Sequence, residues 1–211
     1  MKNVFTASSV ILAINTANAQ TKIGLKLSSS INSPRISYTD GSYVIDKRTN
    51  AFNPLVVLFA DMALAKNHYF STGMGYISKR INLATDGFDT NLSSQKHYNI
   101  QYVQIPATLK LFTDEVALDK KLYFQFGPLF DIAVHHKENN PGLQIIKKFR
   151  PIDISLLFAA GMQIQLAPQT AVQIGVSYTR GLINVARKTA MENGNLIIKN
   201  DLYGIDLAVR F

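Results

Sequence analysis

Eight stretches of the chain alternate apolar and polar residues with the two-residue period of β-strands, and the segments between them alternate strictly between short and long. The predicted strands cover residues 22–31, 54–62, 68–79, 100–112, 122–136, 151–166, 170–180 and 201–211. In a meander of antiparallel strands, this alternation places every short connection at one end and every long connection at the other. The sequence therefore predicts an all-β, up-and-down arrangement whose two ends differ.

The two kinds of connection also differ in composition. The short ones are residues 63–67, 113–121 and 167–169, and the long ones are residues 32–53, 80–99, 137–150 and 181–200. The long connections are polar and rich in Asn, Ser, Thr, Asp and Lys, as loops are. Barrels of outer membranes combine short periplasmic turns with longer external loops, and an even strand number returns both ends to the periplasm. We therefore expect an eight-stranded antiparallel up-and-down transmembrane β-barrel in the outer membrane.

The last predicted strand divides clearly into two faces. One face carries only apolar side chains, those of Tyr203, Ile205, Leu207, Val209 and Phe211. The other carries Gly204, Asp206, Ala208 and Arg210. A strand that is apolar on one side, charged on the other and aromatic at its end suits a barrel wall between lipid and a polar interior. We expect the outer-membrane assembly machinery to recognise this alternation and the terminal aromatic residue during insertion.

Residues 1–19 have the three regions of a secretory signal peptide. Lys2 is followed by an apolar run over residues 4–14 and then by the small residues Ala17 and Ala19. We expect cleavage between Ala19 and Gln20, so that residues 20–211 form the barrel domain. The alternative, a buried N-terminal helix, is disfavoured because the apolar run is short and the small residues lie where a signal peptidase needs them.

Composition narrows the classes of partner. The chain contains no cysteine, so an exported fold of this sequence has no disulfide to stabilise it, and barrel closure would do so instead. The formal net charge is +8, and it falls by one when Lys2 leaves with the signal. An exported protein without a dense basic helix is not expected to bind nucleic acid, so an anionic membrane surface is the better partner.

The predicted polar faces carry charges of both signs. The expected lumen network consists of Lys26, Asp61, Lys110, Asp131, Asp153, Asp206 and Arg210. An eight-stranded barrel is only wide enough to be filled by its own side chains, so these groups should pair with one another. We therefore expect no open pore. Interfacial aromatic girdles are expected from Tyr69, Phe70, Tyr76, Tyr102, Phe112, Tyr123, Tyr178, Tyr203 and Phe211.

Three segments carry a family resemblance. Residues 102–112 (YVQIPATLKLF), 123–128 (YFQFGP) and 203–211 (YGIDLAVRF) resemble the outer-membrane β-barrel domain of Bacteroidetes often labelled PorT-like. The resemblance runs across essentially all of the chain after the signal, and the Ala-Asn-Ala cleavage site is similar too. The sequence departs from the family pattern at Asp206, where glycine is expected. Because PorT is implicated in type IX secretion, the resemblance implies that a role in secretion has to be considered as well.

Candidate catalytic and metal-binding residues are few. His135 and His136 lie near Asp131, but adjacent strand residues point to opposite faces, so the two imidazoles cannot easily share an ion. No Ser-His-acid set emerges, because His68 and His97 lie near opposite ends of the predicted barrel. We therefore expect no catalytic residue, no metal site and no cofactor.

The predicted external loops carry an excess of basic residues. The candidates for contact with anionic lipid are Arg80, Lys147, Lys148, Arg150, Arg187 and Lys188. Lysine and arginine bind phosphates and carboxylates, so lipopolysaccharide is the expected partner at this rim. Ordinary solvated loop charge is the alternative for any single residue.

Four functions remain open at this point. The leading expectation is an integral outer-membrane barrel with a structural, surface-interaction or envelope-assembly role, non-catalytic and not an open pore. A soluble periplasmic carrier of lipocalin type would instead place the apolar face inside, around a ligand. The third function is that of a type IX secretion component, as for PorT, and the fourth is that of a lipid-modifying barrel enzyme. The identity of a ligand of the external loops, or of a secretion partner, does not follow from the pattern.

Overall fold

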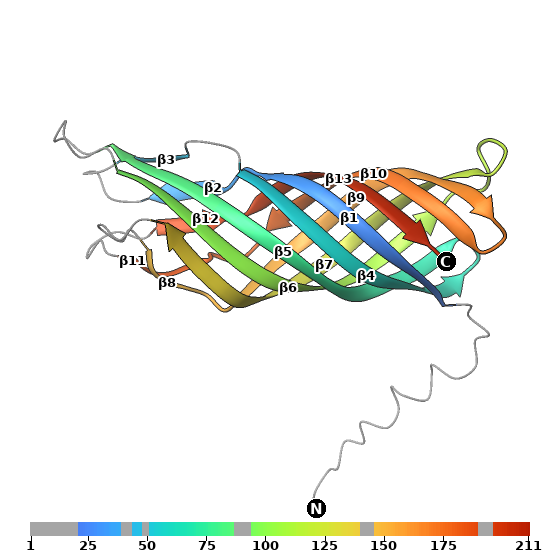
Figure 1. Cartoon of the computed structure of the whole chain (residues 1–211), viewed down its shortest axis with the longest axis horizontal. Coiled ribbons are helices and arrows are strands. Elements are labelled where there is room, and N and C mark those ends of the chain that lie inside the picture. Colours follow the sequence, from blue (N-terminus) through green and yellow to red (C-terminus); the bar gives the residue numbers. More distant parts are fainter. Residues whose placement is uncertain (1–20, 39–43, 48–50, 87–93, 140–145, 190–195) are drawn as a thin grey trace, which may run out of the picture.

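The chain forms a closed β-barrel with extended β-structure beyond one end (Figure 1). The computed structural model describes residues 21–38, 44–47, 51–86, 94–139, 146–189 and 196–211. The eight barrel strands are β1 (Lys22–Asn32), β4 (Ala51–Ala65), β5 (His68–Asp86), β6 (Ser94–Phe112), β7 (Lys120–Asn139), β9 (Ile152–Ala167), β10 (Thr170–Gly181) and β13 (Asp201–Arg210). Each corresponds to one of the strands predicted from the alternation.

Hydrogen bonding closes the sheet completely. Strand β1 pairs antiparallel with β4 on one side and with β13 on the other. The remaining barrel strands pair with their neighbours in chain order, and the β5–β6 pairing completes the ring. A closed ring leaves no unpaired edge in the barrel wall, which a strand needs if it is to cross lipid. The predicted eight-stranded antiparallel meander is confirmed.

The end of the barrel where β1 begins and β13 ends has the tight connections (Figure 1). Asn67 turns the chain between β4 and β5 in a left-handed conformation with φ 64°, and Asp119 does so before β7 with φ 60°. Asparagine and aspartate tolerate this region better than other non-glycine residues. These are the predicted short turns, and in outer-membrane barrels such turns face the periplasm.

The opposite end differs from the prediction in one respect. Much of the length predicted as loop is β-structure, since β5 and β6 stay paired as far as Thr85 and Ser94. The shorter strands here are β2 (Arg35–Tyr38), β3 (Val44–Lys47), β8 (Ile146–Phe149), β11 (Ala186–Thr189) and β12 (Leu196–Lys199). β2 pairs with β12, β8 with β11, and β3 with β5. Strands that project beyond a membrane have no lipid-facing side, so they lack the apolar alternation that identifies strands in a sequence.

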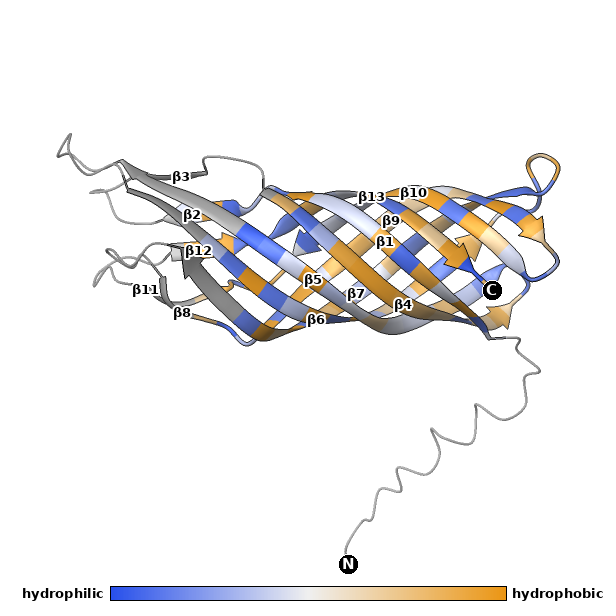
Figure 2. Cartoon of the chain, in the orientation of Figure 1, coloured by the Kyte–Doolittle hydropathy of each residue, from blue (hydrophilic) through white to orange (hydrophobic). Residues whose placement is uncertain are grey.

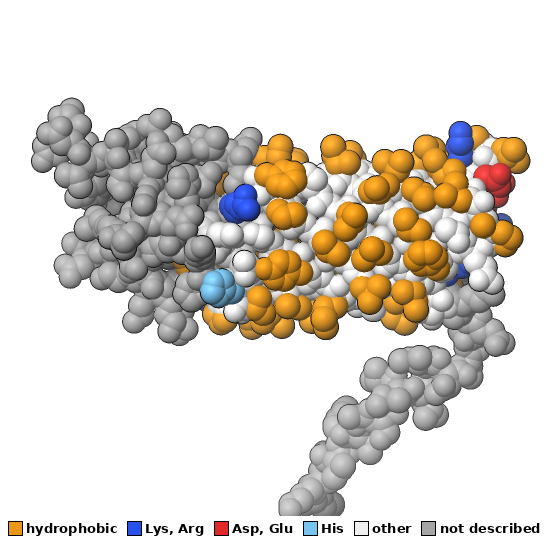
Figure 3. All heavy atoms as spheres, in the orientation of Figure 1, with side chains coloured by type: hydrophobic (Ala, Val, Ile, Leu, Met, Phe, Trp, Pro, Cys, Tyr) orange, Lys and Arg blue, Asp and Glu red, His pale blue; other side chains and the backbone are white. Residues whose placement is uncertain are grey.

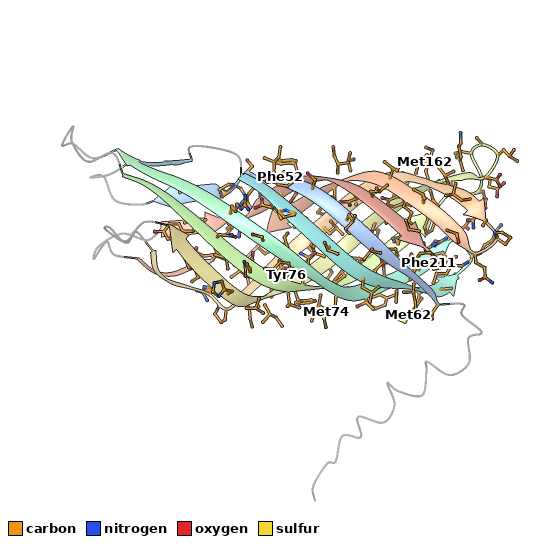
Figure 4. The ribbon with its side chains drawn as sticks, viewed as in Figure 1. Phe52, Met62, Met74, Tyr76, Met162 and Phe211 are labelled. Atoms are coloured by element: carbon orange, nitrogen blue, oxygen red, sulfur yellow. The ribbon has the colours of Figure 1, made fainter. Side chains whose placement is uncertain are left out.

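The two faces of the wall have opposite chemistry. On β9, Ile152 and Phe158 are each 50% exposed, whereas Asp153 and Ser155 are fully buried. The same alternation is visible along the other barrel strands (Figure 2), and apolar side chains cover the middle of the outer surface, with charged groups at both margins (Figure 3). The labelled Phe52, Met74 and Tyr76 lie on the outside (Figure 4). The lipocalin hypothesis, which needs the reverse arrangement, is therefore wrong. No helix among the described residues is long and apolar enough to span a bilayer.

Candidate functional site: the filled lumen and the external rim

The inward-facing side chains of the barrel include an unusual number of buried charges. All seven residues of the expected lumen network lie on the inner face of the wall; Lys26 is partly exposed, and the other six are buried. Charged groups are rarely buried unless they are paired. The contacts of each group therefore decide whether the interior is filled or open.

A lysine cluster crosses the lumen towards its external end. Lys79 Nζ on β5 lies 2.6 Å from Asp131 Oδ2 on β7 and 2.9 Å from Asp153 Oδ2 on β9. Gln104 Nε2 donates to the other oxygen of Asp131 at 2.8 Å. The Lys79 ammonium also lies 5.1 Å from the centre of the Tyr102 ring. Because β5 does not pair with β7 or β9 in the wall, this cluster, named here the Lys79 cluster, connects β5 through the lumen to two strands that are not its neighbours.

A second cluster, named here the Asp61 cluster, lies closer to the periplasmic end. Lys110 Nζ on β6 lies 3.1 Å from Asp61 Oδ2 on β4, and Arg210 Nη1 on β13 lies 3.6 Å from the same oxygen. The Lys110 ammonium is 4.5 Å from the centre of the Phe59 ring. Such cation–π contacts strengthen when the cation is removed from water. Two cations thus share one fully buried carboxylate.

The remaining predicted lumen charges form a third contact. Lys26 Nζ on β1 lies 3.8 Å from Asp206 Oδ2 on β13. The other oxygen of Asp206 accepts hydrogen bonds from Ser28 and Ser177, the latter at 3.1 Å. Asp206, which departs from the family pattern, is therefore held inside the barrel by Lys26, Ser28 and Ser177.

Sequence reasoning missed Lys79, which is the centre of the first cluster. The predicted network had three cations and four carboxylates, and Lys79 makes the two signs equal in number. A signal was present, because Lys79 is an even number of residues from Ser71, which is also buried on the inner face of β5. Its place at the end of the predicted strand, beside a presumed loop, concealed that signal.

Four aromatic residues expected at the membrane interface lie on the inner face instead. Tyr102, Phe112 and Tyr123 are buried, and each has the inward position in its strand. Tyr69 is half-buried, and its ring lies 5.5 Å from the Phe112 ring. Gly175 makes room for Tyr123, since a Cβ at this glycine would lie 2.3 Å from the tyrosine oxygen. These rings lie among the charged groups of the lumen, so the girdle assignment of these four residues is wrong.

The external end of the lumen is closed by a buried apolar cluster. Its members are Ile77, Tyr98, Ile100, Tyr102, Val185, Ala186, Ile198 and Leu202. Val185 and Ile198 come from the segments beyond the barrel wall, and the Val185 amide donates to the Ile198 carbonyl at 2.9 Å. The internal cavity lined by Lys26, Gln104, Lys110 and Tyr123 has a volume of about 40 Å³. That volume holds one or a few water molecules.

The expected rim residues are described in part. Arg80 follows Lys79 on β5 and is exposed, and Arg150 is exposed just before β9. Lys147 and Lys148 belong to β8, and Arg187 and Lys188 to β11, but their side chains lie outside the described residues. The expected cleavage site at Ala19 and Gln20 also lies outside them.

Within the described part of the chain, no group of three His, Asp or Glu side chains is placed to hold a metal ion. His135 is exposed on β7, where a register shift interrupts the pairing with β6. The side chain of His136 is outside the described residues. His68 contacts the Lys66 carbonyl through Nδ1 at 2.7 Å in the short turn.

Comparisons with known proteins agree with this architecture. The fold is similar to that of Neisserial surface protein A, with a TM-score of 0.53, 10% identity and coverage of 90% of this chain and 95% of that one. It is also similar to OprG from Pseudomonas aeruginosa, with a TM-score of 0.54, 13% identity and coverage of 92% and 96%. A comparison with curated proteins found no match. At such identities the likeness shows the fold.

The sequence itself matches a family model described as the outer membrane protein beta-barrel domain over residues 14–187. This match covers most of the chain, and the barrel with its apolar outer wall is the structure that such a family requires. The chain therefore belongs to the outer membrane protein β-barrel domain family, and its location is the outer membrane.

Proposed function

We propose that the protein is a non-conducting integral barrel of the outer membrane, with a structural, surface-interaction or envelope-assembly role and no catalysis. The observation that carries this proposal is the filled lumen. The Lys79 cluster crosses it, the Asp61 cluster occupies it nearer the periplasm, and apolar side chains close its external end. A barrel filled in this way offers a rigid, stable wall and presents its extended external strands as the variable surface.

The external rim is the proposed site of interaction with the membrane surface. Arg80 and Arg150 are exposed at this end, and the basic residues of β8 and β11 belong to the same region of the chain. Cations at this level would meet the phosphates of lipopolysaccharide in the outer leaflet. Lipopolysaccharide is therefore the proposed partner of the rim, and the outer-membrane assembly machinery the proposed partner during insertion.

The finer family assignment is part of the proposal. The segments at 102–112, 123–128 and 203–211 support membership of the PorT-like group of Bacteroidetes, and the segment at 1–19 supports export through a signal peptide. A secretion component should present a surface for a protein partner, and the tight turns at the periplasmic end offer little area for one. Envelope structure or surface interaction is therefore the favoured role.

Conductance measurements test the proposal directly. The protein is purified from outer membranes and inserted into planar lipid bilayers, with a general porin as the positive control. We expect no stable open-channel current, while the same sample shows a heat-dependent mobility shift on a gel, which demonstrates a folded barrel. Stable current steps from a sample with the mobility shift would overturn the non-conducting function.

A further inference from the structure

We propose that the outer wall of the barrel has a built site for one molecule of lipid A, the phosphorylated and multiply acylated anchor of lipopolysaccharide. Its acyl chains would occupy an apolar groove across six strands, and its phosphates would contact Arg80 and Arg180. This inference deepens the proposed contact with lipopolysaccharide, and it is independent of whether the lumen conducts ions.

One wall of the groove is a continuous row of large side chains. Strand pairing places its members directly opposite one another on neighbouring strands, and all of them project from the outer face. From β7 to β4 the row consists of Phe126, Phe158, Tyr178, Tyr203, Ile31 and Phe52. Phe52 is labelled on the outer surface in Figure 4. Aromatic residues beside acyl chains supply large apolar contacts with few rotatable bonds.

The row beside it contains small residues, which produce the hollow. Ala160 lies between Phe124 on β7 and Val176 on β10, and Ser29 on β1 lies opposite Ile205 on β13. The resulting groove has a volume of about 850 Å³. Sites for small molecules have volumes of roughly 300–1,000 Å³. A smooth wall of equal-sized side chains would leave no such space, so the small residues define where a lipid fits.

The centre of the wall is held rigidly. Tyr178 and Tyr203 stack with their ring centres 5.0 Å apart, and the Tyr178 hydroxyl donates to Asp201 Oδ2 at 3.3 Å. Arg35 fixes Asp201 through Nε at 2.8 Å. A wall that is already ordered loses little side-chain entropy when a flexible chain packs against it.

The groove has a direction that matches the outer leaflet. Phe126 lies near the periplasmic start of β7, whereas Phe52 lies at the external start of β4, so the row rises along the wall towards the external end. Arg80 lies beside the external end of the row. Its main-chain amide donates to Oδ1 of Asn53 at 2.7 Å, and Asn53 is the residue after Phe52. An apolar groove that ends beside a cation has the polarity of a lipid with an anionic headgroup.

A second cation lies above the middle of the row. Arg180 is exposed, two residues beyond Tyr178 on the same face of β10. The neighbouring carboxylate, Asp201, is already paired with Arg35, so the charge above the groove is positive. Two separated cations and a groove six strands wide suit a lipid with two phosphates and several acyl chains, which favours lipid A over a phospholipid.

Native mass spectrometry tests the site. The protein, purified from outer membranes in a mild detergent, is titrated with bis-phosphorylated lipid A, with its dephosphorylated form and with phosphatidylglycerol. Ala160→Leu fills the groove, and Ala60→Leu is the matched control, because Ala60 has an outward position on β4 outside the groove. Arg80→Gln and Arg180→Gln remove the cations beside the groove, and Arg150→Gln removes a rim cation outside it. Lys120→Gln is the control, because it removes an exposed cation at the periplasmic end. Heat-modifiability confirms that each variant is folded.

We expect one bound bis-phosphorylated lipid A, with affinity about tenfold lower for each of Arg80→Gln and Arg180→Gln because a charge-assisted hydrogen bond is lost. Ala160→Leu should lower the affinity comparably, while Ala60→Leu and Lys120→Gln should leave it unchanged. Arg150→Gln, which removes a rim cation outside the groove, should lower it less than Arg80→Gln or Arg180→Gln. Equal losses in Ala160→Leu and Ala60→Leu, or equal affinity for phosphatidylglycerol, would overturn the groove. Equal losses of affinity in all three arginine variants would also overturn the groove as the binding site. They would leave the general contact between the rim and lipopolysaccharide, and therefore the proposed function, intact.

Discussion

Two lysine–aspartate pairs in this barrel have the same chemistry and opposite surroundings. In the Lys79 cluster, the side chains of Lys79 and Asp131 are 1% and 0% exposed, and the charged atoms are 2.6 Å apart. At the other end, Lys66 in the β4–β5 turn and Asp114 in the β6–β7 connection are 86% and 81% exposed, and their charged atoms are 3.5 Å apart. Two further pairs lie between these extremes, one in the Asp61 cluster and one between Arg35 and Asp201.

The difference teaches what the lumen charges do. An exposed pair gains little, since water and salt screen it and either partner alone is well solvated. A buried pair is not a large net source of stability either, because desolvation offsets the attraction, but the removal of one partner leaves the other unsolvated. Buried pairs therefore fix which side chains can fill the lumen, and the loss of stability on removing one partner should follow the burial of the pair.

The largest effect is expected for Lys79→Met. The substitution keeps the length of the side chain but leaves Asp131 and Asp153 buried without a cation, so unfolding should require about 3–5 kcal/mol less free energy. The measurement is the urea midpoint of the heat-modifiable band in lipid vesicles. Lys66→Met is the matched exposed control.

A second variant keeps this prediction testable if Lys79→Met fails to fold. The triple variant Lys79→Met, Asp131→Asn, Asp153→Asn removes the charge of all three partners and should recover most of the lost stability. Equal urea midpoints for Lys79→Met and Lys66→Met would contradict the role assigned to burial.

Lys110→Met in the Asp61 cluster should have a smaller effect, about 1–3 kcal/mol, because Asp61 keeps Arg210 at 3.6 Å. The two cations then substitute partly for each other. The double variant with Arg210→Met should lose more stability than the two single losses added, since it alone leaves Asp61 without a cation. A double-mutant cycle measures this coupling, and strict additivity would show that the cations act independently.

The sequence predicts the barrel, but it does not predict the order of these effects. Eight strands and their directions follow from the apolar outer face, which repeats every second residue wherever a strand crosses lipid. The same period places Asp131 and Asp153 on the inner face. It says nothing about their partner, because Lys79 reaches them across the lumen and not through the pairing of neighbouring strands.

The differences between the predicted and the observed structure have two physical origins. Beyond the membrane no lipid contacts the strands, so their outer face need not be apolar and the alternation disappears. The sequence therefore predicts loops where β5 and β6 remain paired and where short strands surround them. Inside the barrel, aromatic side chains suit both the lumen and the membrane interface, so residue type alone misplaces Tyr102 and Tyr123. Position within the strand is the better guide, because both share the parity of charged or polar neighbours.

Arg35→Met tests the third pair in the series. Arg35 is 43% exposed, and Asp201 retains hydrogen bonds from the Gly181 amide at 3.1 Å and the Tyr178 hydroxyl. The loss should therefore be about 0.5–1 kcal/mol. Urea unfolding of Arg35→Met is compared with that of Arg150→Met, which controls for a general change in rim charge. A loss of stability in Arg35→Met as large as that in Lys110→Met would contradict the expected order.

The smallest effect at neutral pH is expected for Asp114→Asn in the exposed turn. A hydrogen bond from Asn67 at 3.0 Å and the nearby Lys66 hold the pKa of Asp114 below its usual value. Because the pKa is lower in the folded state, the stabilising contribution is present above the unfolded pKa and is lost as the pH falls through the folded pKa.

Asp114→Asn should therefore leave the urea midpoint at pH 7 almost unchanged and should abolish a small decrease that the unchanged protein shows below about pH 4. Midpoints at pH 7 and pH 3 test this, with Glu115→Gln as the control in the same turn. If Asp114→Asn lowered the midpoint at pH 7 as much as Arg35→Met, exposure would not be what separates the pairs. Equal losses would also exclude pair geometry as the cause of the order, because the ion pair at Asp201 is 2.8 Å long and the one at Asp114 is 3.5 Å long.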